Sequence, residues 1–274
     1  MRIALGIEYD GAGFTGWQTQ ADRRGVQDAV ERALAQVAGF PIATICAGRT
    51  DSGVHALDQV IHFDTDVTRP VTAWVRGVNR FLPASVAVQW ARSAGPEFHA
   101  RYGALRRRYD YWILNAPVRA PLAHARAGWV FRPLDENAMQ RGATHLIGRH
   151  DFTSFRSAEC QAATPVRAVD ELNVERRGPL VRISIAANAF LHHMVRNIVG
   201  ALVYIGVGRQ PDTWTKDVLR ARDRSAGAPT FSAAGLYLAR VEYDPAFCLP
   251  APAAAHPLWI DAYTNQDLRA DARG

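Results

Sequence analysis

The sequence predicts an α+β protein made of two ferredoxin-like halves, each with the element order β-α-β-β-α-β. Two observations support this class. Strand-like apolar runs alternate with helically spaced apolar residues, and pairs of neighbouring strands imply hairpins and antiparallel pairing. With 274 residues, 48% of them hydrophobic, the chain can bury a full core. We expect two antiparallel sheets joined across a central cleft, with the helices on the outer face.

The first half is expected to span residues 1–104. It opens with an apolar strand at 2–9, followed by the turn-like, glycine-rich sequence DGAGFTGW. Apolar residues then recur at steps of three and four from Val26 to Val37, which indicates an amphipathic helix. The other elements expected in this half are a strand at 42–47, a glycine-rich turn at 48–53, a strand at 59–64, a helix at 71–82 and a strand at 86–92.

The second half, expected at 105–248, repeats this order more loosely. Its expected elements are a strand at 107–115, a helix at 135–147, a hairpin at 166–188, an apolar helix at 190–206 and a strand at 235–243. The composition then shifts to proline and alanine, which predicts a C-terminal tail at 249–274 that wraps the surface or frays.

The charge balance favours a polyanionic partner. Lysine and arginine together number 32 against 26 acidic residues, and Lys216 is the single lysine. Arginine binds phosphate bidentately and stacks on bases, which suits RNA, although a GC-rich genome also favours arginine codons. The sequence has no apolar run of membrane-spanning length and no signal-peptide pattern, so we expect a cytoplasmic protein.

The densest group of polar residues lies between two apolar strands, at 47–56. Asp51 lies two residues after Arg49, and a turn that brings them together would hold the carboxylate ionised and oriented, as a nucleophile or base must be. An ordinary Asx turn with a nearby ion pair explains the same residues. His55 and His62 could join Asp51 and Asp64 as metal ligands, but their spacing matches no metal-binding pattern, and we expect no metal.

Two further patterns could serve RNA. In the expected helix at 190–206, His192 and Arg196 lie four residues apart, which predicts a narrow polar stripe on an otherwise apolar helix. An arginine buried there needs an anion, unless the stripe meets solvent or a core acid. The run that contains Arg106, Arg107, Arg108 and Tyr109 combines basic and aromatic residues at a strand entry, which fits phosphate binding and base stacking, although such residues are often simply solvated.

Taken together, these segments resemble the tRNA pseudouridine synthases of the TruA type over nearly the whole chain. Seven motifs occur in the family's order, and together they are highly specific. They are EYDGAGFTGWQ at 8–18, AGRTDSGVHA at 47–56, QVIHFDT at 59–65, FHAR at 98–101, RRYDYWI at 107–113, DFTSF at 151–155 and NAFLHHMVRNIVG at 188–200.

The resemblance implies an isomerase that converts uridine to pseudouridine at positions 38–40 in the anticodon stem-loop of tRNA. It implies that Asp51 is the nucleophile, that Arg49 pairs with it, that Tyr109 stacks on the target uracil and that Arg196 contacts the catalytic carboxylate. The reaction needs no cofactor, and either addition to uracil C6 or attack on the ribose fits a single carboxylate.

The family further implies a homodimer that binds tRNA across both subunits. Arg106, Arg107 and Arg108 are our candidates for binding its phosphates, together with Arg23 and Arg24. This sequence departs from the family at Ser52, where alanine is common, and in its C-terminal extension.

Two other functions compete with the synthase. A non-catalytic RNA-binding protein with ferredoxin-like sheets would keep the arginines and aromatics but would not need Asp51, because a carboxylate repels phosphate. A metal-dependent nuclease would need clustered carboxylates, which the sequence does not contain.

Overall fold

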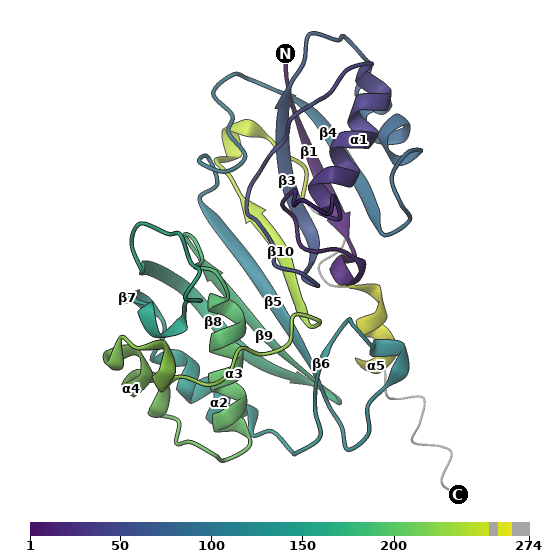
Figure 1. Ribbon diagram of the computed structural model, residues 1–274. Coiled ribbons are helices and arrows are strands. Elements are labelled where there is room, and N and C mark those ends of the chain that lie inside the picture. The colour runs from purple at the N-terminus through teal and green to yellow at the C-terminus, as the bar shows by residue number, and fades with distance from the viewer. Residues whose placement is uncertain (252–256, 265–274) are drawn as a thin grey trace, which may run out of the picture. The chain divides into compact units, whose positions relative to one another are not determined.

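The computed structural model describes residues 1–251 and 257–264. The described residues divide into two compact units (Figure 1): the first comprises 1–107 and 237–251, the second 108–236 and 257–264. Both units combine helices with a largely antiparallel sheet, so the predicted α+β class is confirmed. No helix in the described part of the chain is both long and apolar enough to span a bilayer.

The sheet of the first unit has the strand order β4-β1-β3-β10, with the short strand β2 on β3. β1 pairs antiparallel with both β3 and β4, whereas β10 runs parallel to β3, with Tyr237 opposite His55. The strand bounds are β1 Arg2–Tyr9, β2 Ile45–Cys46, β3 His55–Asp64, β4 Val86–Ala94 and β10 Leu236–Glu242.

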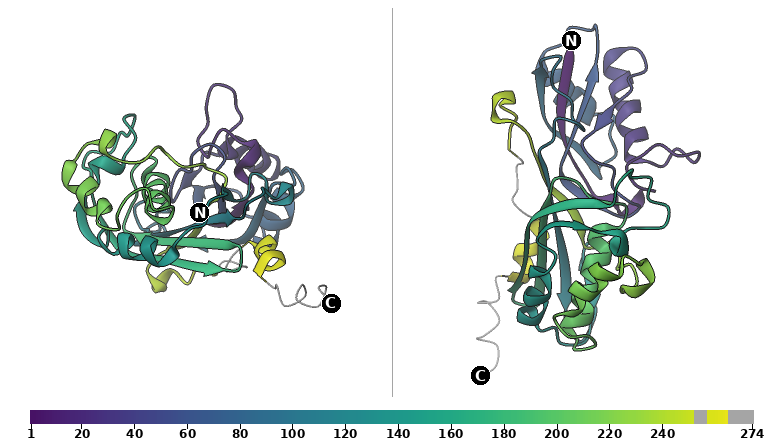
Figure 2. Two further views of the ribbon diagram at one scale, coloured as in Figure 1. Left: turned by 90° about the horizontal axis from the view of Figure 1, so that it is seen from below. Right: turned by 90° about the vertical axis from the view of Figure 1, so that its left-hand side faces the viewer.

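One face of this sheet carries the helical segments. Helix α1 (Val26–Ala38) follows the predicted periodicity and ends at Gly39, which adopts the left-handed conformation that glycine tolerates best. The right-hand view of Figure 2 shows α1 beside one face of the strands of this unit. A second helical segment, expected at 71–82, contains a π-helical stretch at Ala73–Gly77, where Trp74 packs edge-to-face on Phe63 at a ring distance of 5.2 Å.

The second unit has the strand order β5-β9-β8-β7, with β6 parallel to β5. Its strands are β5 Arg106–Asn115, β6 Gly128–Val130, β7 Gly148–Asp151, β8 Val166–Arg177 and β9 Leu180–Ala187. Helix α2 (Glu136–Thr144) packs against β8 and against α3 (Met194–Gly206), and Figure 1 shows both helices over the same face of these strands. A further helix, α4 (Trp214–Ala221), contacts α2 and α3.

The strand expected at 235–243 is β10, and the sequence did not predict its pairing with β3. Two details differ from the sequence prediction. The helix expected from 190 begins at Met194, because His193 adopts a left-handed conformation with φ of 63°. Residues 257–264 of the expected tail form a 3-10 turn (Leu258–Ile260) and helix α5 (Asp261–Thr264), and the rest of the tail from 252 on lies outside the described residues.

Candidate active site

The candidate nucleophile lies in the loop 47–54, which connects β2 to β3 in the first unit and which we call the catalytic loop. The loop ends in a tight turn, in which the Val54 amide donates to the Asp51 carbonyl at 3.1 Å. Gly53 has φ of 77°, a conformation that glycine adopts without strain. Arg49 is exposed and Asp51 is half-buried, while Thr50 between them is buried. Arg49 and Asp51 are therefore accessible, and the buried Thr50 anchors the backbone between them.

The glycine-rich segment 10–17 holds the catalytic loop from one side. The buried Thr50 hydroxyl is hydrogen-bonded to the Tyr9 hydroxyl at 2.8 Å, and the Thr50 carbonyl accepts from the Trp17 amide at 3.0 Å. The Ser52 hydroxyl donates to the Phe14 carbonyl at 3.2 Å. Backbone and side-chain bonds thus fix the loop on both flanks of Asp51.

Two glycines of this segment are required by its close approach to the loop. A Cβ on Gly11 would lie 1.9 Å from the Val54 carbonyl oxygen, and one on Gly16 would lie 2.8 Å from the Thr50 carbonyl oxygen. Gly16 also has φ of 103°, where other residues are strained. The DGAGFTGW sequence, predicted only as a turn, is therefore the surface that the catalytic loop packs against.

The loop is held from its other side by residues of the first unit. The buried Gln59 side chain donates to the Gly48 carbonyl at 2.7 Å, and the Ala47 amide donates to the Val60 carbonyl at 2.8 Å. The Arg107 guanidinium donates to the Ala47 carbonyl at 2.9 Å and to the Arg101 carbonyl at 2.6 Å. Arg107, predicted as a phosphate ligand, thus supports the backbone of the catalytic loop.

The two histidines considered as metal ligands each accept a hydrogen bond from a backbone amide. His55 Nδ1 accepts from the Gly11 amide at 3.1 Å, and its ring stacks on Tyr237 at 4.6 Å. His62 Nδ1 accepts from the Ala100 amide at 3.1 Å, and burial lowers the pKa of this side chain to about 4. These contacts position the N-terminal segment and residues near 100.

Asp64, which was also considered as a metal ligand, forms an ion pair with Arg2. The Arg2 guanidinium donates to both carboxylate oxygens of Asp64, at 2.9 and 2.8 Å. The hydrogen bond from Arg2 is the main reason that the pKa of the Asp64 carboxyl lies below its usual range.

Tyr109 and Arg196, the other two candidates, lie in the second unit. Tyr109 on β5 is buried and meets Phe190 edge-to-face at a ring distance of 5.0 Å. Arg196, half-buried in the first turn of α3, donates from Nε to the Phe231 carbonyl at 2.9 Å. Because α3 begins only at Met194, His192 and Arg196 do not share a helical stripe, which corrects the sequence interpretation.

The remaining basic candidates have partners within their own units. Arg106 donates to both carboxylate oxygens of Glu242, at 3.0 and 3.1 Å, and Arg108 donates to Glu171 at 2.7 Å and to the Ser184 hydroxyl at 3.3 Å. Arg23 and Arg24 are exposed, and Arg23 lies 3.5 Å from the buried carboxylate of Asp28. A phosphate would share the Arg106 and Arg108 guanidiniums with these acids.

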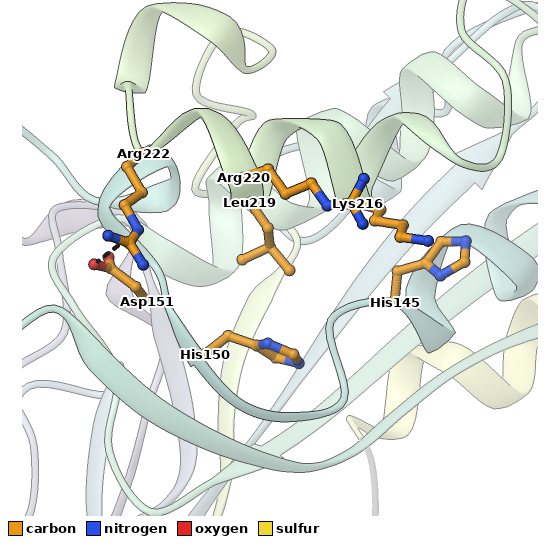
Figure 3. Close-up of a pocket in the computed structure, with 7 residues that line it drawn as sticks. All are labelled: His145, His150, Asp151, Lys216, Leu219, Arg220 and Arg222. Carbon is orange, nitrogen blue, oxygen red and sulfur yellow. Dashed lines mark ion pairs between the residues drawn. The ribbon is translucent and has the colours of Figure 1, made fainter.

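The sequence analysis missed a basic cavity in the second unit, with a volume of about 500 Å³ (Figure 3). Lys216 and Arg220 lie four residues apart on exposed positions of α4, a spacing that the sequence does contain. The predicted elements included no helix at 214–221, so this signal was not recognised. The full lining is His145, His150, Asp151, Lys216, Leu219, Arg220 and Arg222.

Comparison with known proteins decides the family. The sequence profile of a family described as tRNA pseudouridine synthase matches residues 6–103 and 143–244. A protein of Paraburkholderia phytofirmans described as tRNA pseudouridine synthase A is 52% identical over 97% of this chain and 98% of its own length. One of Burkholderia lata with the same description is 53% identical over 97% of this chain and 99% of its own. The chain belongs to the tRNA pseudouridine synthase family.

Membership confirms the resemblance on which the sequence analysis relied. A tRNA pseudouridine synthase is an isomerase that converts uridine in tRNA to pseudouridine, so the enzyme is favoured over the non-catalytic RNA-binding protein. The catalytic loop lies inside the first matched range, and Tyr109 lies between the two ranges.

Proposed function

We propose that Asp51 is the nucleophile of a reaction that isomerises uridine to pseudouridine in the anticodon arm of tRNA, at positions 38–40. The glycosidic bond between N1 and C1′ breaks, the uracil rotates while it is held, and C5 bonds to C1′. The proton on C5 leaves and N1 gains one, so atoms balance without an oxidant or a transferred group. The observation that most directly supports this proposal is the accessible Asp51 carboxylate, which lies on a loop that is hydrogen-bonded on both sides of this residue.

Arg49 and Arg196 are proposed to act with this carboxylate. Their proposed role is to bind and orient the carboxylate that acts in either addition to uracil C6 or attack on the ribose. Arg49 is on the catalytic loop itself, and the Phe231 carbonyl orients the Arg196 side chain through Nε. The proposal includes no metal and no cofactor.

Tyr109 is proposed to stack on the target uracil once the base has left the RNA stack. Extruding a base costs a few kcal/mol, and stacking on an aromatic ring offsets about 1–3 kcal/mol of it. Phe190 supports the Tyr109 ring from its edge. Arg106, Arg107 and Arg108 remain predicted phosphate ligands, and their intramolecular contacts give them a structural role as well.

We also propose a homodimer that acts in the cytoplasm, where tRNA is modified. Exposed apolar side chains gather in a short stretch of the second unit, at Val118, Leu122, Trp129 and Phe131. Trp129 and Phe131 pack on each other at a ring distance of 6.1 Å. An apolar surface of this kind fits a second copy of the chain better than it fits RNA.

The decisive experiment is release of tritium from tRNA that carries uridine labelled at C5. We expect release by the native enzyme, unchanged by a chelator, and a loss of at least ~10³-fold in Asp51→Asn, since removal of a nucleophile costs that much or more. Asp66→Asn, an exposed aspartate of the same unit, is the matched control and should retain full activity. Normal release from Asp51→Asn that binds tRNA normally would assign the nucleophile to another residue.

A pair of substitutions tests Tyr109. Tyr109→Phe keeps the ring and its contact with Phe190, so tRNA binding should be unchanged, while loss of the hydroxyl slows proton removal from C5 by about 10²–10⁴-fold. Tyr109→Leu should in addition raise the Kd for tRNA by roughly 10-fold, because stacking is lost. Equal rates and equal affinities in the two variants would contradict the assignment.

A further inference from the structure

The basic cavity of the second unit has two walls from distant parts of the sequence. Helix α4 contributes Lys216 and Arg220, and Arg222 follows the end of the helix. The opposite wall comes from β7 and the residues before it, and Figure 3 shows Asp151 and His150 there, facing α4. All lining residues belong to one compact unit, so the cavity is formed within it.

Positive charge dominates this lining. Lys216, Arg220 and Arg222 are exposed cations, and Asp151 is the single acidic residue among the lining residues. Asp151 is already engaged, because it accepts from the Thr153 amide at 2.9 Å and from the Thr153 hydroxyl at 2.6 Å and lies 3.6 Å from the Arg222 guanidinium. The hydroxyl bond from Thr153 is the main reason that the pKa of the Asp151 carboxyl is lowered, so its charge is fixed and compensated.

The rest of the lining points to phosphate rather than to a free nucleotide. Leu219 is its only apolar side chain, so a base would find little surface to bury. The His150 ring is held by the backbone three residues before it, with Nε2 2.8 Å from the Ile147 carbonyl oxygen, and lies edge-on to Phe152. Lysine binds phosphate as a point charge and arginine binds it through a planar fork, so together they fit neighbouring phosphates of a nucleic acid strand.

We propose that this cavity binds phosphodiester groups of the tRNA backbone, through residues that take no part in the reaction. The proposal rests on the proposed function, because it adds a second contact to the same substrate. Phosphate contacts fix the register of a nucleic acid without reading its sequence. The cavity therefore positions the tRNA, and its loss affects binding rather than the chemical step.

Charge removal tests the proposal through salt dependence. The double variant Lys216→Ala/Arg220→Ala should raise the Kd for tRNA about 5–20-fold near 0.1 M salt and reduce the slope of log K against log[salt] by about 1–2, since each phosphate contact contributes roughly 0.7–0.9. Under saturating tRNA its kcat should equal that of the native enzyme. Arg209→Ala, an exposed arginine of the same unit outside the cavity, should change the slope by much less.

The single lysine permits a footprint at the cavity itself. An amine-selective reagent modifies Lys216 and the N-terminal amine of Met1, and mass spectrometry reads each separately. We expect tRNA to protect Lys216 at micromolar concentration, and inorganic phosphate at matched phosphate concentration to leave it reactive. The N-terminal amine, in the other unit, reports any non-specific loss of reagent.

The outcomes separate this proposal from the proposed function. Protection by tRNA together with a reduced salt slope supports the cavity as an RNA site, even if no uridine is isomerised. An unchanged slope or a Lys216 that tRNA does not protect overturns it, even if the enzyme is fully active. Equal protection by inorganic phosphate assigns the cavity to a free anion and also overturns the proposal.

Discussion

The catalytic loop at 47–54 and the basic cavity between α4 and β7 are built in opposite ways. The loop depends on contacts to its backbone: the Ala47, Gly48 and Thr50 carbonyls each accept a hydrogen bond from outside the loop. The cavity depends on exposed side chains, with one loose ion pair between Arg222 and Asp151 at 3.6 Å.

Under the two proposals above, the loop positions a reactive group and the cavity captures a large substrate, and the difference in their construction fits these two roles. A nucleophile must be held to within a fraction of an ångström, which backbone hydrogen bonds provide and mobile surface side chains do not. Phosphate capture needs charge at the right place on the surface and tolerates side-chain motion. Changes at the loop should therefore alter rate and stability, and changes at the cavity should alter affinity alone.

Among substitutions that leave the proposed reacting side chains unchanged, the largest effect is expected where an added methyl group would displace the loop. Gly16→Ala places a Cβ 2.8 Å from the Thr50 carbonyl oxygen at a residue with φ of 103°. We expect kcat for tritium release to fall about 100-fold and stability to fall by about 1–3 kcal/mol, with tRNA affinity retained.

Gly13→Ala is the matched control for this substitution. Gly13 belongs to the same segment, and a Cβ there would have no heavy atom within 4 Å. Its kcat and Tm should stay close to those of the native enzyme. A Gly16→Ala enzyme with native kcat would show that the loop need not be held by the glycine-rich segment.

A second substitution tests the strand that follows the loop. Asp58 on β3 is buried, accepts from the Val241 amide at 3.0 Å, and has its pKa raised to about 6, chiefly by burial. A raised native pKa means that the folded state binds the proton more tightly, so the stability from this group is present below about pH 4 and is lost as pH rises to 6. Asp58→Asn removes this loss and should stabilise the protein by about 2 kcal/mol at pH 8 and very little at pH 4.

Urea unfolding at the two pH values measures this effect. Asp64→Asn is the control, and its effect on stability should have the opposite sign. Arg2 lowers the pKa of Asp64, so the stability that the Asp64 carboxylate contributes is present at neutral pH and lost under acid conditions. Neither variant should change kcat. A stability gain from Asp58→Asn that is equal at pH 4 and pH 8 would contradict the titration of Asp58.

Sequence reading was most successful where neighbouring residues determine the structure. Helix α1 follows its apolar spacing, and the hairpin of β8 and β9 turns at Gly178, where φ is 57°. The loop at 47–54 was also placed correctly between two strands, because its polar residues are contiguous and lie between apolar runs, while its catalytic role stays a prediction.

Features that depend on distant partners escaped prediction. β10 pairs with β3, some 180 residues earlier in the sequence. Arg106 forms its ion pair with Glu242, 136 residues later in the sequence. The cavity combines residues near 150 with residues near 220. Phe190 and Leu191 continue the apolar spacing of the helix toward its N-terminus. The left-handed His193 nevertheless makes α3 begin at Met194, because a local backbone conformation of this kind is not encoded by periodicity.

The smallest effect is expected at Arg222, where stability and binding should separate. Arg222 ends α4 in a left-handed conformation with φ of 48°, which costs a non-glycine residue about 1 kcal/mol, and its exposed ion pair with Asp151 contributes less than that. Arg222→Gly should leave stability within about 1 kcal/mol of native while raising the Kd for tRNA about 2–5-fold. Arg222→Lys keeps both the charge and the backbone cost, so it should bind tRNA nearly as the native enzyme does. The glycine variant removes the charge and keeps the protein folded, so weaker tRNA binding by Arg222→Gly but not by Arg222→Lys would show that the charged side chain contributes to affinity. A loss of stability above about 2 kcal/mol in Arg222→Gly would instead give Arg222 a structural role like that of the loop residues.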